Sequence, residues 1–513
     1  MASCSINDED ALSGQRRSGE TLADGVVILL ALIVVQRLIG FVRSMLYCRW
    51  LTPEQLGQWD VAFGFLMLAA PLSVLAISSA FGRYTEHYRQ QGHLRTFIRR
   101  TALLVTLLSA VAAAAVYAGR DLLAETLFND PEQAGLAVPL AFALVTVIVF
   151  NYLTDLFTGL RSARMIAVLQ LVNSVAFAGL SGLLMCGAGA TVANAVRAYA
   201  LACLVSLLVA MGPLRRCWGE SPAGEQPLGV GPFWSKLLSF AAWVWVGSLL
   251  SNLFGIADRY LILHCSLFTP EEAAAQVGQY HASRIVPLLL VSVAGLLATI
   301  ATPHLTQDWE QGRHDRVQQR LNLLLKLVGL GMAAGGLFVL WAAPLLFEVA
   351  FRGKFPQGQA ILPWTLTYCI WFSMALVAQN YLWCHERARL ASLALAAGLV
   401  VNVGLNLALM PHLGLFGAVL ATTIANLVVL VLICAMNRGL GFHMHRGVWL
   451  VLTLPVGYWL GPWPALLSLL VLLLAAVRTD CLFDSEEKQL IQDKIAEYWL
   501  RGRELLSWPG IKA

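Results

Sequence analysis

The sequence predicts an all-α polytopic membrane protein, with about fourteen transmembrane helices arranged as two pseudo-symmetric six-helix bundles plus two extra C-terminal helices. Three observations lead to this prediction. Of the 513 residues, 58% are hydrophobic and only 13% are charged, whereas soluble domains contain about 25% charged residues. Apolar stretches of spanning length recur along the whole chain. Motifs in the first half return in the same order in the second half. A soluble enzyme is therefore excluded.

The predicted spans, each about 20 residues long, follow one another with short connections. They fall at 25–46, 60–80, 97–118, 137–158, 165–186, 190–212, 237–257, 279–301, 322–343, 361–383, 390–410, 414–436, 447–461 and 463–478. The first is too long for the apolar core of a signal peptide, and the residues before it are acidic rather than basic. The connections leave no room for a large aqueous domain.

Lys and Arg are concentrated in the even-numbered connections between these spans. The second connection contains Arg83, Arg89, Arg95, Arg99 and Arg100, and the eighth contains Arg313, Arg316, Arg320 and Lys326. The odd-numbered connections are poor in both residue types. Because cytoplasmic loops carry the excess of Lys and Arg, this alternation predicts that both termini are cytoplasmic.

Two sets of motifs repeat in the same order in the two halves. Asn151-Tyr152-Leu153 is followed by Asn173, and Asn380-Tyr381-Leu382 is followed at the same spacing by Asn402. Thr52-Pro53-Glu54 before Gly57-Gln58-Trp59 is echoed by Thr269-Pro270-Glu271 before Gly278-Gln279-Tyr280. Each copy covers six spans, an even number, so both copies enter the membrane from the same side. This predicts two bundles related by an axis along the membrane normal.

These patterns divide the chain into six predicted segments. They are a cytoplasmic N-terminal tail (1–24), an N-terminal six-helix bundle (25–213), a cytoplasmic linker rich in Gly and Pro (214–236), a C-terminal six-helix bundle (237–446), two additional transmembrane helices (447–478) and a cytoplasmic amphipathic tail (479–513). The tail has apolar and basic residues on opposite helical faces, so we expect it to lie on the membrane surface.

The sequence has no pattern that indicates catalysis. It contains no Walker loop, and its ten cysteines have no metal-ligand spacing. We find no paired carboxylates on a long outward loop, and the basic residues are dispersed rather than clustered for nucleic acid. We therefore expect a protein that is not an enzyme and that uses no cofactor, no metal and no nucleic-acid partner.

Several arginines fall inside the predicted spans: Arg37 and Arg43 in the first, Arg197 in the sixth, Arg259 at the end of the seventh and Arg284 in the eighth. A centrally placed Arg costs roughly 2.5–3.5 kcal/mol on insertion scales, so such a residue usually has a function. By the predicted topology all five lie in the outer half of the membrane. We expect them to line a wet cavity that binds a diphosphate. For Arg43, Arg259 and Arg284, which lie near span ends, the alternative is snorkelling to the interface.

Polar side chains at helix centres are the predicted further lining of this cavity, suited to sugar hydroxyls. They are Gln36, Asn151, Gln170, Asn173, Asn252, Gln379, Asn402 and Asn406. The alternative is hydrogen bonding between helices, which we favour for the repeat-related Asn173 and Asn402. The candidate sites for a coupling proton or sodium ion are Asp60, Asp155 and Asp258. For Asp60 and Asp258 the alternative is a simple interfacial position.

Two segments resemble a known group of exporters. Arg37-Leu38-Ile39-Gly40 running into Leu51-Thr52-Pro53-Glu54-Gln55-Leu56-Gly57-Gln58-Trp59 resembles the opening of polysaccharide and O-antigen flippases of the multidrug/oligosaccharidyl-lipid/polysaccharide (MOP) exporter superfamily. Asn402 through Asn406, Pro411 and Gly414-Leu415-Phe416-Gly417-Ala418 resemble the eleventh-to-twelfth helix segment of that group. Related lipid II flippases carry Arg on the first helix, which Arg37 and Arg43 resemble.

The resemblance implies a MATE-like fold that works by alternating access. It implies a substrate of undecaprenyl diphosphate-linked oligosaccharide, such as a lipopolysaccharide precursor, moved from the cytoplasmic to the periplasmic leaflet of a bacterial inner membrane. The implied partners are this lipid-linked glycan, membrane lipids, a coupling H⁺ or Na⁺ and polysaccharide polymerase machinery. Two other functions stay open. A drug or cation antiporter of the same superfamily would rely on an acidic pocket, and a membrane glycosyltransferase or polymerase would need longer outward loops.

Overall fold

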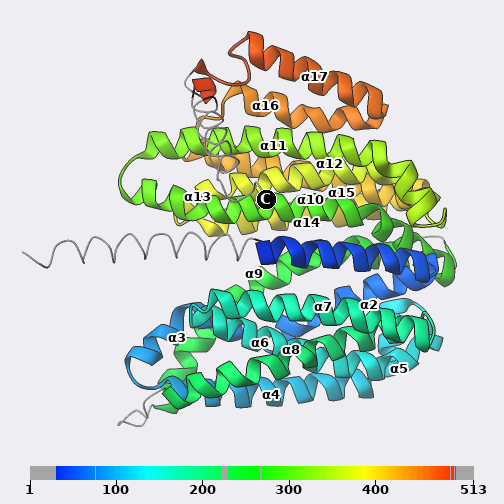
Figure 1. Cartoon of the computed structure of the whole chain (residues 1–513), viewed down its shortest axis with the longest axis vertical. Helices are drawn as coiled ribbons and strands as arrows, with labels where there is room; N and C mark the ends of the chain where they lie inside the picture. Colours follow the sequence, from blue (N-terminus) through cyan, green and yellow to red (C-terminus); the bar gives the residue numbers. More distant parts are fainter. Residues whose placement is uncertain are drawn as a thin grey trace, which may run out of the picture. The chain divides into compact units, whose positions relative to one another are not determined.

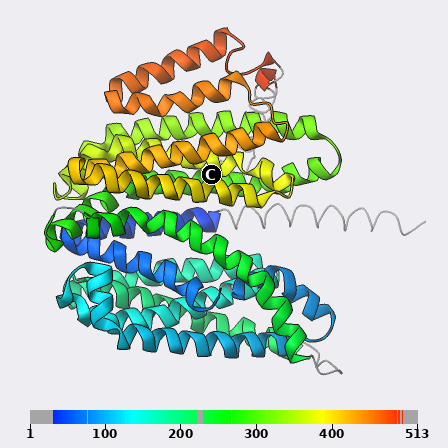
Figure 2. The same cartoon turned by 180° about the vertical axis from the view of Figure 1, so that it is seen from behind.

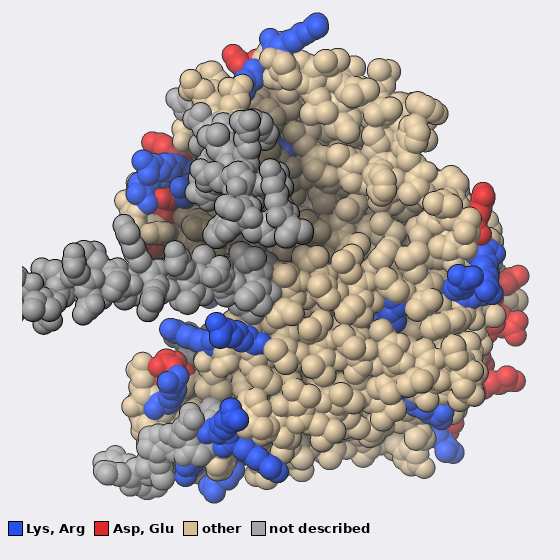
Figure 3. Space-filling view, in the orientation of Figure 1, with Lys and Arg blue, Asp and Glu red and all other residues tan. Residues whose placement is uncertain are grey.

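The computed structural model describes residues 31–75, 77–220, 229–265, 268–485, 487–489 and 492, and every regular element in these ranges is a helix (Figure 1). Eleven of the described helices are long and apolar enough to cross a membrane. In the space-filling view the charged side chains lie mainly toward the helix ends, and other residues form the surfaces between them (Figure 3). The predicted fold class, an all-helical multi-pass membrane protein, is confirmed.

The chain forms two compact units, Met1–Ala282 and Ser283–Ala513, and the boundary lies inside a long helix, α10. The N-terminal unit contains the helix over Ala31–Trp50, then α2 (Pro53–Ser73), η1 (Ile77–Ala80), α3 (Phe81–Gln90), α4 (Leu94–Ala118), α5 (Arg120–Leu123), η2 (Ala124–Phe128), η3 (Pro131–Leu136), α6 (Ala137–Gly159), α7 (Ala163–Gly187), α8 (Val192–Glu220), α9 (Val230–Cys265) and the first part of α10 (Pro270–Glu310).

In the N-terminal unit, α8 packs between α6 and α7, and α4 packs on α6 (Figure 1). The contact face of α8 is formed by Ala195, Ala198 and Ala202, which are fully buried and recur at helical spacing. Helices in membranes associate by close packing, and small residues allow their backbones to approach. The run of alanines therefore explains why α8 occupies the centre of this unit.

The C-terminal unit contains the rest of α10, then α11 (His314–Pro344), η4 (Leu345–Ala350), α12 (Pro356–Ala378), α13 (Asn380–Cys384), α14 (Ala388–Leu413), α15 (Leu415–Gly439), α16 (Arg446–Thr453), η5 (Leu454–Leu460) and α17 (Pro462–Arg478). Here α12 packs between α11 and α15, and α14 and α15 form a hairpin (yellow in Figure 2). Gly414 joins the hairpin with φ of 56°, and a Cβ on Gly417 would lie 2.7 Å from the Leu409 carbonyl oxygen. Both positions therefore favour glycine.

The predicted count of about fourteen spans stays a prediction. α2 is missing from the eleven apolar helices because its first turns are polar, including Glu54, Gln58 and Asp60. The last two predicted spans correspond to the short pair α16–η5 and to α17, which has only 17 residues. The span predicted at 60–80 stays a prediction: its residues belong to α2, which begins earlier, at Pro53, where Thr52 caps it, and to η1.

The predicted segment boundaries stay predictions as well. The tail 1–24 and most of the amphipathic tail lie outside the described residues, as do residues 221–228 of the linker. The two compact units divide inside α10 rather than at the linker, because α9 packs against α2 and η1 of the N-terminal unit.

Candidate functional site

The two copies of the Thr-Pro-Glu motif lie against each other in the N-terminal unit, at the starts of α2 and α10. A Cβ on Gly57 would lie 1.9 Å from the Ala274 carbonyl oxygen, and a Cβ on Gly278 would lie 1.9 Å from the Pro53 carbonyl oxygen. No side chain fits at either position, so the two backbones are in direct contact. The glycines that the repeat places at equivalent positions therefore form a helix crossing.

Both helices begin in the same way. Thr52 Oγ1 accepts a hydrogen bond from the Gln55 amide, and the Thr52 amide donates to Gln55 Oε1, each at 3.2 Å. In the second copy, Thr269 Oγ1 accepts from the Glu272 amide at 3.4 Å, and the Thr269 amide donates to Glu272 Oε2 at 3.1 Å. These are capping boxes. The two copies of the motif thus share the same capping geometry as well as a similar sequence.

Asp60, one turn after Gly57, lies between a guanidinium group and an imidazole ring. Its Oδ2 is 2.8 Å from Arg259 Nε of α9, and its Oδ1 is 2.7 Å from His281 Nδ1 of α10. The Asp60 side chain is only 3% exposed. A Cβ on Gly64 would lie 2.8 Å from Arg259 Nη1, so this glycine leaves room for the guanidinium group. The buried Asp60 carboxylate therefore joins α2 to side chains of both α9 and α10.

The neighbouring residues form a second buried contact. The Tyr280 hydroxyl donates to Asp258 Oδ2 at 2.8 Å, and both residues are almost fully buried. We call Asp60, Asp258, Arg259, Tyr280 and His281 the clasp. The sequence suggested Asp60 and Asp258 for ion coupling and Arg259 for substrate binding, and both roles stay predictions. The structure pairs Asp60 with Arg259. It also adds Tyr280 and His281. The sequence does contain a signal for His281. This residue directly follows Gly278-Gln279-Tyr280, just as Asp60 directly follows Gly57-Gln58-Trp59 in the first copy of the motif.

A carboxyl cluster lies close to the clasp, at the polar start of α2. Partial burial raises the pKa of Glu54, and the negative charges of Glu271 and Asp130 raise that pKa further. A raised pKa means that the carboxyl group binds its proton more tightly there than it does in water. This end of the N-terminal unit therefore gathers several titratable groups around one helix crossing.

Arg43 packs onto an aromatic cluster inside the N-terminal unit. Its guanidinium carbon lies 3.9 Å from the centre of the Phe177 ring, a cation–π contact. The Phe177 ring lies 4.9 Å from Tyr199 and 6.3 Å from Tyr47, measured between ring centres. The Tyr47 hydroxyl is hydrogen-bonded to Ser181 at 2.7 Å. Arg43 therefore has a packed position on the first helix.

The remaining arginines have other surroundings. Arg37 is exposed in the N-terminal unit and makes no hydrogen bond or ion pair with a described residue. Arg197 is exposed and donates to Asn194 Oδ1 at 3.1 Å, near the start of α8. Arg284 is half-buried in the C-terminal unit, within electrostatic range of Cys369. The five arginines thus have different surroundings, and of the two exposed ones, Arg37 and Arg197, only Arg197 donates a hydrogen bond to a described residue.

The amide side chains divide into two groups. Asn173 donates to Cys203 Sγ of the next helix at 3.5 Å, and Asn402 donates to Thr422 Oγ1 of the next helix at 3.3 Å. Asn406 and Asn252 donate to carbonyl oxygens of their own helices. Gln36, Gln170 and Gln379 are half-buried. The repeat-related Asn173 and Asn402 thus each donate to a side chain of the next helix, at different positions along it.

A cavity of about 270 Å³ lies inside the N-terminal unit, between α2, α4, α6 and α9. Asn151, Thr154, Asp155 and Ser248 contribute its polar lining, and Pro71 lies at its wall. Asn151 and Asp155, which the sequence suggested separately, therefore share a cavity. It is a small, polar pocket with a carboxylate, and it is lined by none of the five arginines.

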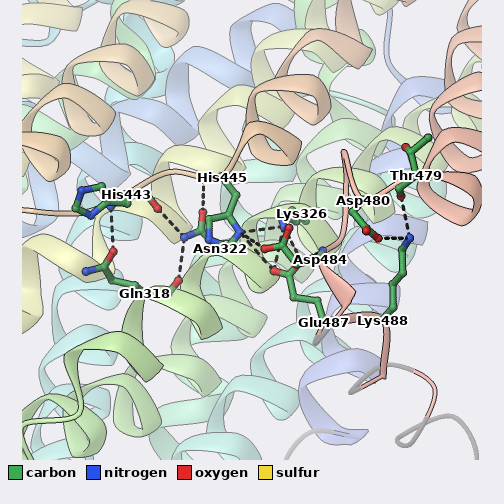
Figure 4. Close-up of polar contacts among 10 residues, drawn as sticks. All are labelled: Gln318, Asn322, Lys326, His443, His445, Thr479, Asp480, Asp484, Glu487 and Lys488. Carbon is green, nitrogen blue, oxygen red and sulfur yellow. Dashed lines mark hydrogen bonds and ion pairs between the residues drawn. The ribbon is translucent and has the colours of Figure 1, made fainter.

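A second polar cluster lies in the C-terminal unit (Figure 4). Gln318 and Asn322, on one face of α11, bind the chain that precedes α16. The His443 amide donates to Gln318 Oε1 at 3.0 Å, Asn322 Nδ2 donates to the His443 carbonyl oxygen at 2.9 Å, and the His445 amide donates to Asn322 Oδ1 at 2.9 Å. The segment 443–445 is thus held against α11 by its backbone.

Lys326, one turn further along α11, holds the segment that follows α17. Its side chain is 1% exposed, and Nζ donates to both carboxylate oxygens of Glu487 at 2.7 and 3.0 Å. His445, Asp484 and Glu487 are close enough together to hold a metal ion, but the Lys326 ammonium already neutralises Glu487. We therefore assign this cluster to the attachment of the C-terminal segment.

With this geometry established, comparison with known proteins shows the family. The model of the polysaccharide biosynthesis protein family matches residues 22–309, which is more than half of the chain. The chain belongs to this family. No curated protein matches the sequence significantly.

Solved structures with a similar fold are flippases and transporters. The lipid II flippase MurJ, in an inward closed conformation, matches this polysaccharide biosynthesis protein with a TM-score of 0.65 and 11% identity, over 87% of this chain and 98% of that chain. An inward-facing multidrug resistance MATE family transporter of the MOP superfamily gives 0.61 and 16%, over 79% and 95%. A MOP superfamily transporter from Pyrococcus furiosus gives 0.57 and 15%, over 81% and 94%. At these identities the likeness establishes the fold, and the resemblance to the MOP superfamily is confirmed.

Proposed function

We propose that this polysaccharide biosynthesis protein is a flippase that moves an undecaprenyl diphosphate-linked oligosaccharide from the cytoplasmic to the periplasmic leaflet by alternating access. The observation that carries the proposal is the family match over residues 22–309, in a chain whose described helices include eleven of spanning character. Polysaccharide precursors are made on one side of the membrane and used on the other, and such a chain can provide the path.

Elementary physical chemistry explains why a protein is needed. A diphosphate and several sugars lose their hydration in about 30 Å of hydrocarbon, and burying even one unpaired polar group costs several kcal/mol. A protein that replaces this hydration and opens in turn to each side removes the barrier. The prenyl chain can stay in the lipid throughout the reaction.

Arg37 is the best candidate to bind the diphosphate. Arg43 is packed on Phe177, Arg197 is bonded to Asn194 and Arg259 is paired with Asp60. The exposed guanidinium of Arg37 keeps its donors available, and a guanidinium can bind phosphate oxygens in a bidentate fashion. In this proposal the protein lies in a bacterial inner membrane with both termini in the cytoplasm, and the product is passed to polysaccharide polymerase machinery.

The proposal is tested by deleting the gene. We expect an undecaprenyl-linked glycan to accumulate on the cytoplasmic leaflet, measured as glycan that an impermeant outer-leaflet label does not reach in spheroplasts. The complemented strain provides the control. Normal glycan export together with reduced dye efflux would favour the antiporter function over the flippase.

The role of Arg37 is tested in the same strain. We expect Arg37→Ala to abolish glycan export at normal protein abundance, and Arg37→Lys to keep part of it, because an ammonium retains the charge without the bidentate geometry. Arg120→Ala is the matched control, since Arg120 is also exposed but lies outside the spans. Full export by Arg37→Ala would assign this residue a structural role.

A further inference from the structure

The clasp occupies a position that has to change in an alternating-access cycle. It joins the starts of α2 and α10, which are the two copies of one repeat motif, through backbones that leave no room for a Cβ at Gly57 or Gly278. By the proposed topology this contact lies at the extracytoplasmic end of the spans. For a path to open to the extracytoplasmic side, the two copies of the motif have to separate. Interactions that stabilise the clasp therefore oppose this opening.

The contact beside the glycines is polar and titratable. His281 Nδ1 lies 2.7 Å from Asp60 Oδ1, and the two side chains are 21% and 3% exposed. Imidazole is the side chain whose charge changes near neutral pH. A protonated ring carries hydrogen on both nitrogens and would donate to Asp60 as an ion pair, whereas a neutral ring carries hydrogen on only one nitrogen and has no charge.

Other charged and titratable groups face this pair from each neighbouring element. Arg259 of α9 binds the second oxygen of Asp60, and Asp258 of α9 accepts from Tyr280 of α10. Glu54 of α2, Glu271 of α10 and Asp130 before η3 form the carboxyl cluster near the same helix starts. Both oxygens of Asp60 therefore face nitrogen donors, whereas sodium, a hard cation, would need several oxygen ligands.

We propose that the His281–Asp60 pair is the proton-coupling site of this transporter, and that proton uptake by His281 closes the clasp. In the open form the neutral imidazole takes a proton from the extracytoplasmic side. Both ring nitrogens then carry hydrogen, and Nδ1–H donates to the Asp60 carboxylate. That proton leaves to the cytoplasmic side while the path is open inward, and its loss weakens the bond and allows the two motif copies to separate. This inference rests on the proposed function, since it names the coupling ion of that same cycle.

The sign of the pH dependence follows from linkage. The closed clasp binds the proton more tightly than the open clasp, so the closed fraction rises as pH falls. One linked proton changes the ratio of closed to open protein by up to about tenfold per pH unit.

The experiment measures the clasp directly, without cargo. Spin labels are attached to cysteines introduced as Glu54→Cys and Glu271→Cys, in a chain whose native cysteines are replaced, and their separation is followed by electron paramagnetic resonance in lipid nanodiscs from pH 5.5 to 8.5. These substitutions also remove two of the nearby carboxyl groups, so those groups cannot cause a pH response. We expect the closed fraction to rise on acidification in this labelled chain.

His281→Gln is the matched variant, because its amide can still donate to Asp60 but does not titrate. We expect a closed fraction that is low and independent of pH. A pH response that survives in His281→Gln, or no response in either protein, would overturn the proposal, as would closure that follows sodium at constant pH. The spin-label measurement needs no substrate, so the proton-coupling proposal can fail while glycan export still depends on the gene. Failure of this proposal is therefore distinguishable from failure of the flippase proposal.

Discussion

Adding one methyl group at the helix crossing should destabilise the protein by a predictable amount. In Gly57→Ala the new Cβ would lie 1.9 Å from the Ala274 carbonyl oxygen, whereas a carbon–oxygen contact needs about 3.3 Å. The distance between the new Cβ and the carbonyl oxygen would have to grow by roughly 1.4 Å, so the two helices would have to move apart. The obstacle is backbone, which cannot rotate away, so the cost lies near the upper end of overpacking values, about 3 kcal/mol. Better helix propensity returns up to about 1 kcal/mol, leaving a net loss of about 2 kcal/mol.

The assay is denaturant unfolding of the purified protein in detergent micelles, with Gly255→Ala as the control. Gly255 lies in α9 of the same unit, and a Cβ there meets nothing within 4 Å. We expect Gly57→Ala and the reciprocal Gly278→Ala to lose stability, and Gly255→Ala to keep or gain it. Equal stability of Gly57→Ala and Gly255→Ala would refute the direct backbone contact, and with it the argument that the motif copies meet at a crossing.

Two further predictions concern buried and half-buried cations. Lys326→Met should lower the free energy of unfolding by about 3–5 kcal/mol, because it leaves the Glu487 carboxylate without its partner. Adding Glu487→Gln should recover much of that loss, and a double variant no more stable than the single one would contradict the pairing. Arg43→Gln should lower the apparent Tm as well as glycan export, because it removes the cation–π contact with Phe177, whereas Arg37→Ala should lower export at unchanged Tm. Identical behaviour of the two arginine variants would remove the distinction between a packed and a cargo-binding guanidinium.

Much of the architecture was predictable because it depends on local patterns. Apolar length and loop charge identify membrane helices, and the order of motifs identified a repeat. The repeat predicts similar environments, and Asn173 and Asn402 each donate a hydrogen bond to the next helix, although to acceptors at different positions of the repeat. The capping boxes at Thr52 and Thr269, which the structure adds, also depend only on residues three positions apart.

The pairing within the site was not predictable in the same way. Arg259 and Asp60 are 199 residues apart in the sequence, and each alone is consistent with substrate binding, ion coupling or an interfacial position. Arg43 likewise looks like any other intramembrane arginine until Phe177 of α7 is placed beneath it. A charged residue in a span signals that a partner is needed, but only the packing of the helices identifies the partner.

The repeat gives a reason why the clasp pairs an acid with a base. Equivalent residues face each other where the two motif copies cross, as Gly57 and Gly278 show, and the neighbouring equivalent positions Trp59 and Tyr280 are both aromatic. At the next position, identical charges would repel across a buried contact. Asp60 in one copy and His281 in the other convert that repulsion into a bond of 2.7 Å. This departure from symmetry thus falls at a contact between the copies, and it makes the strength of that contact depend on a proton.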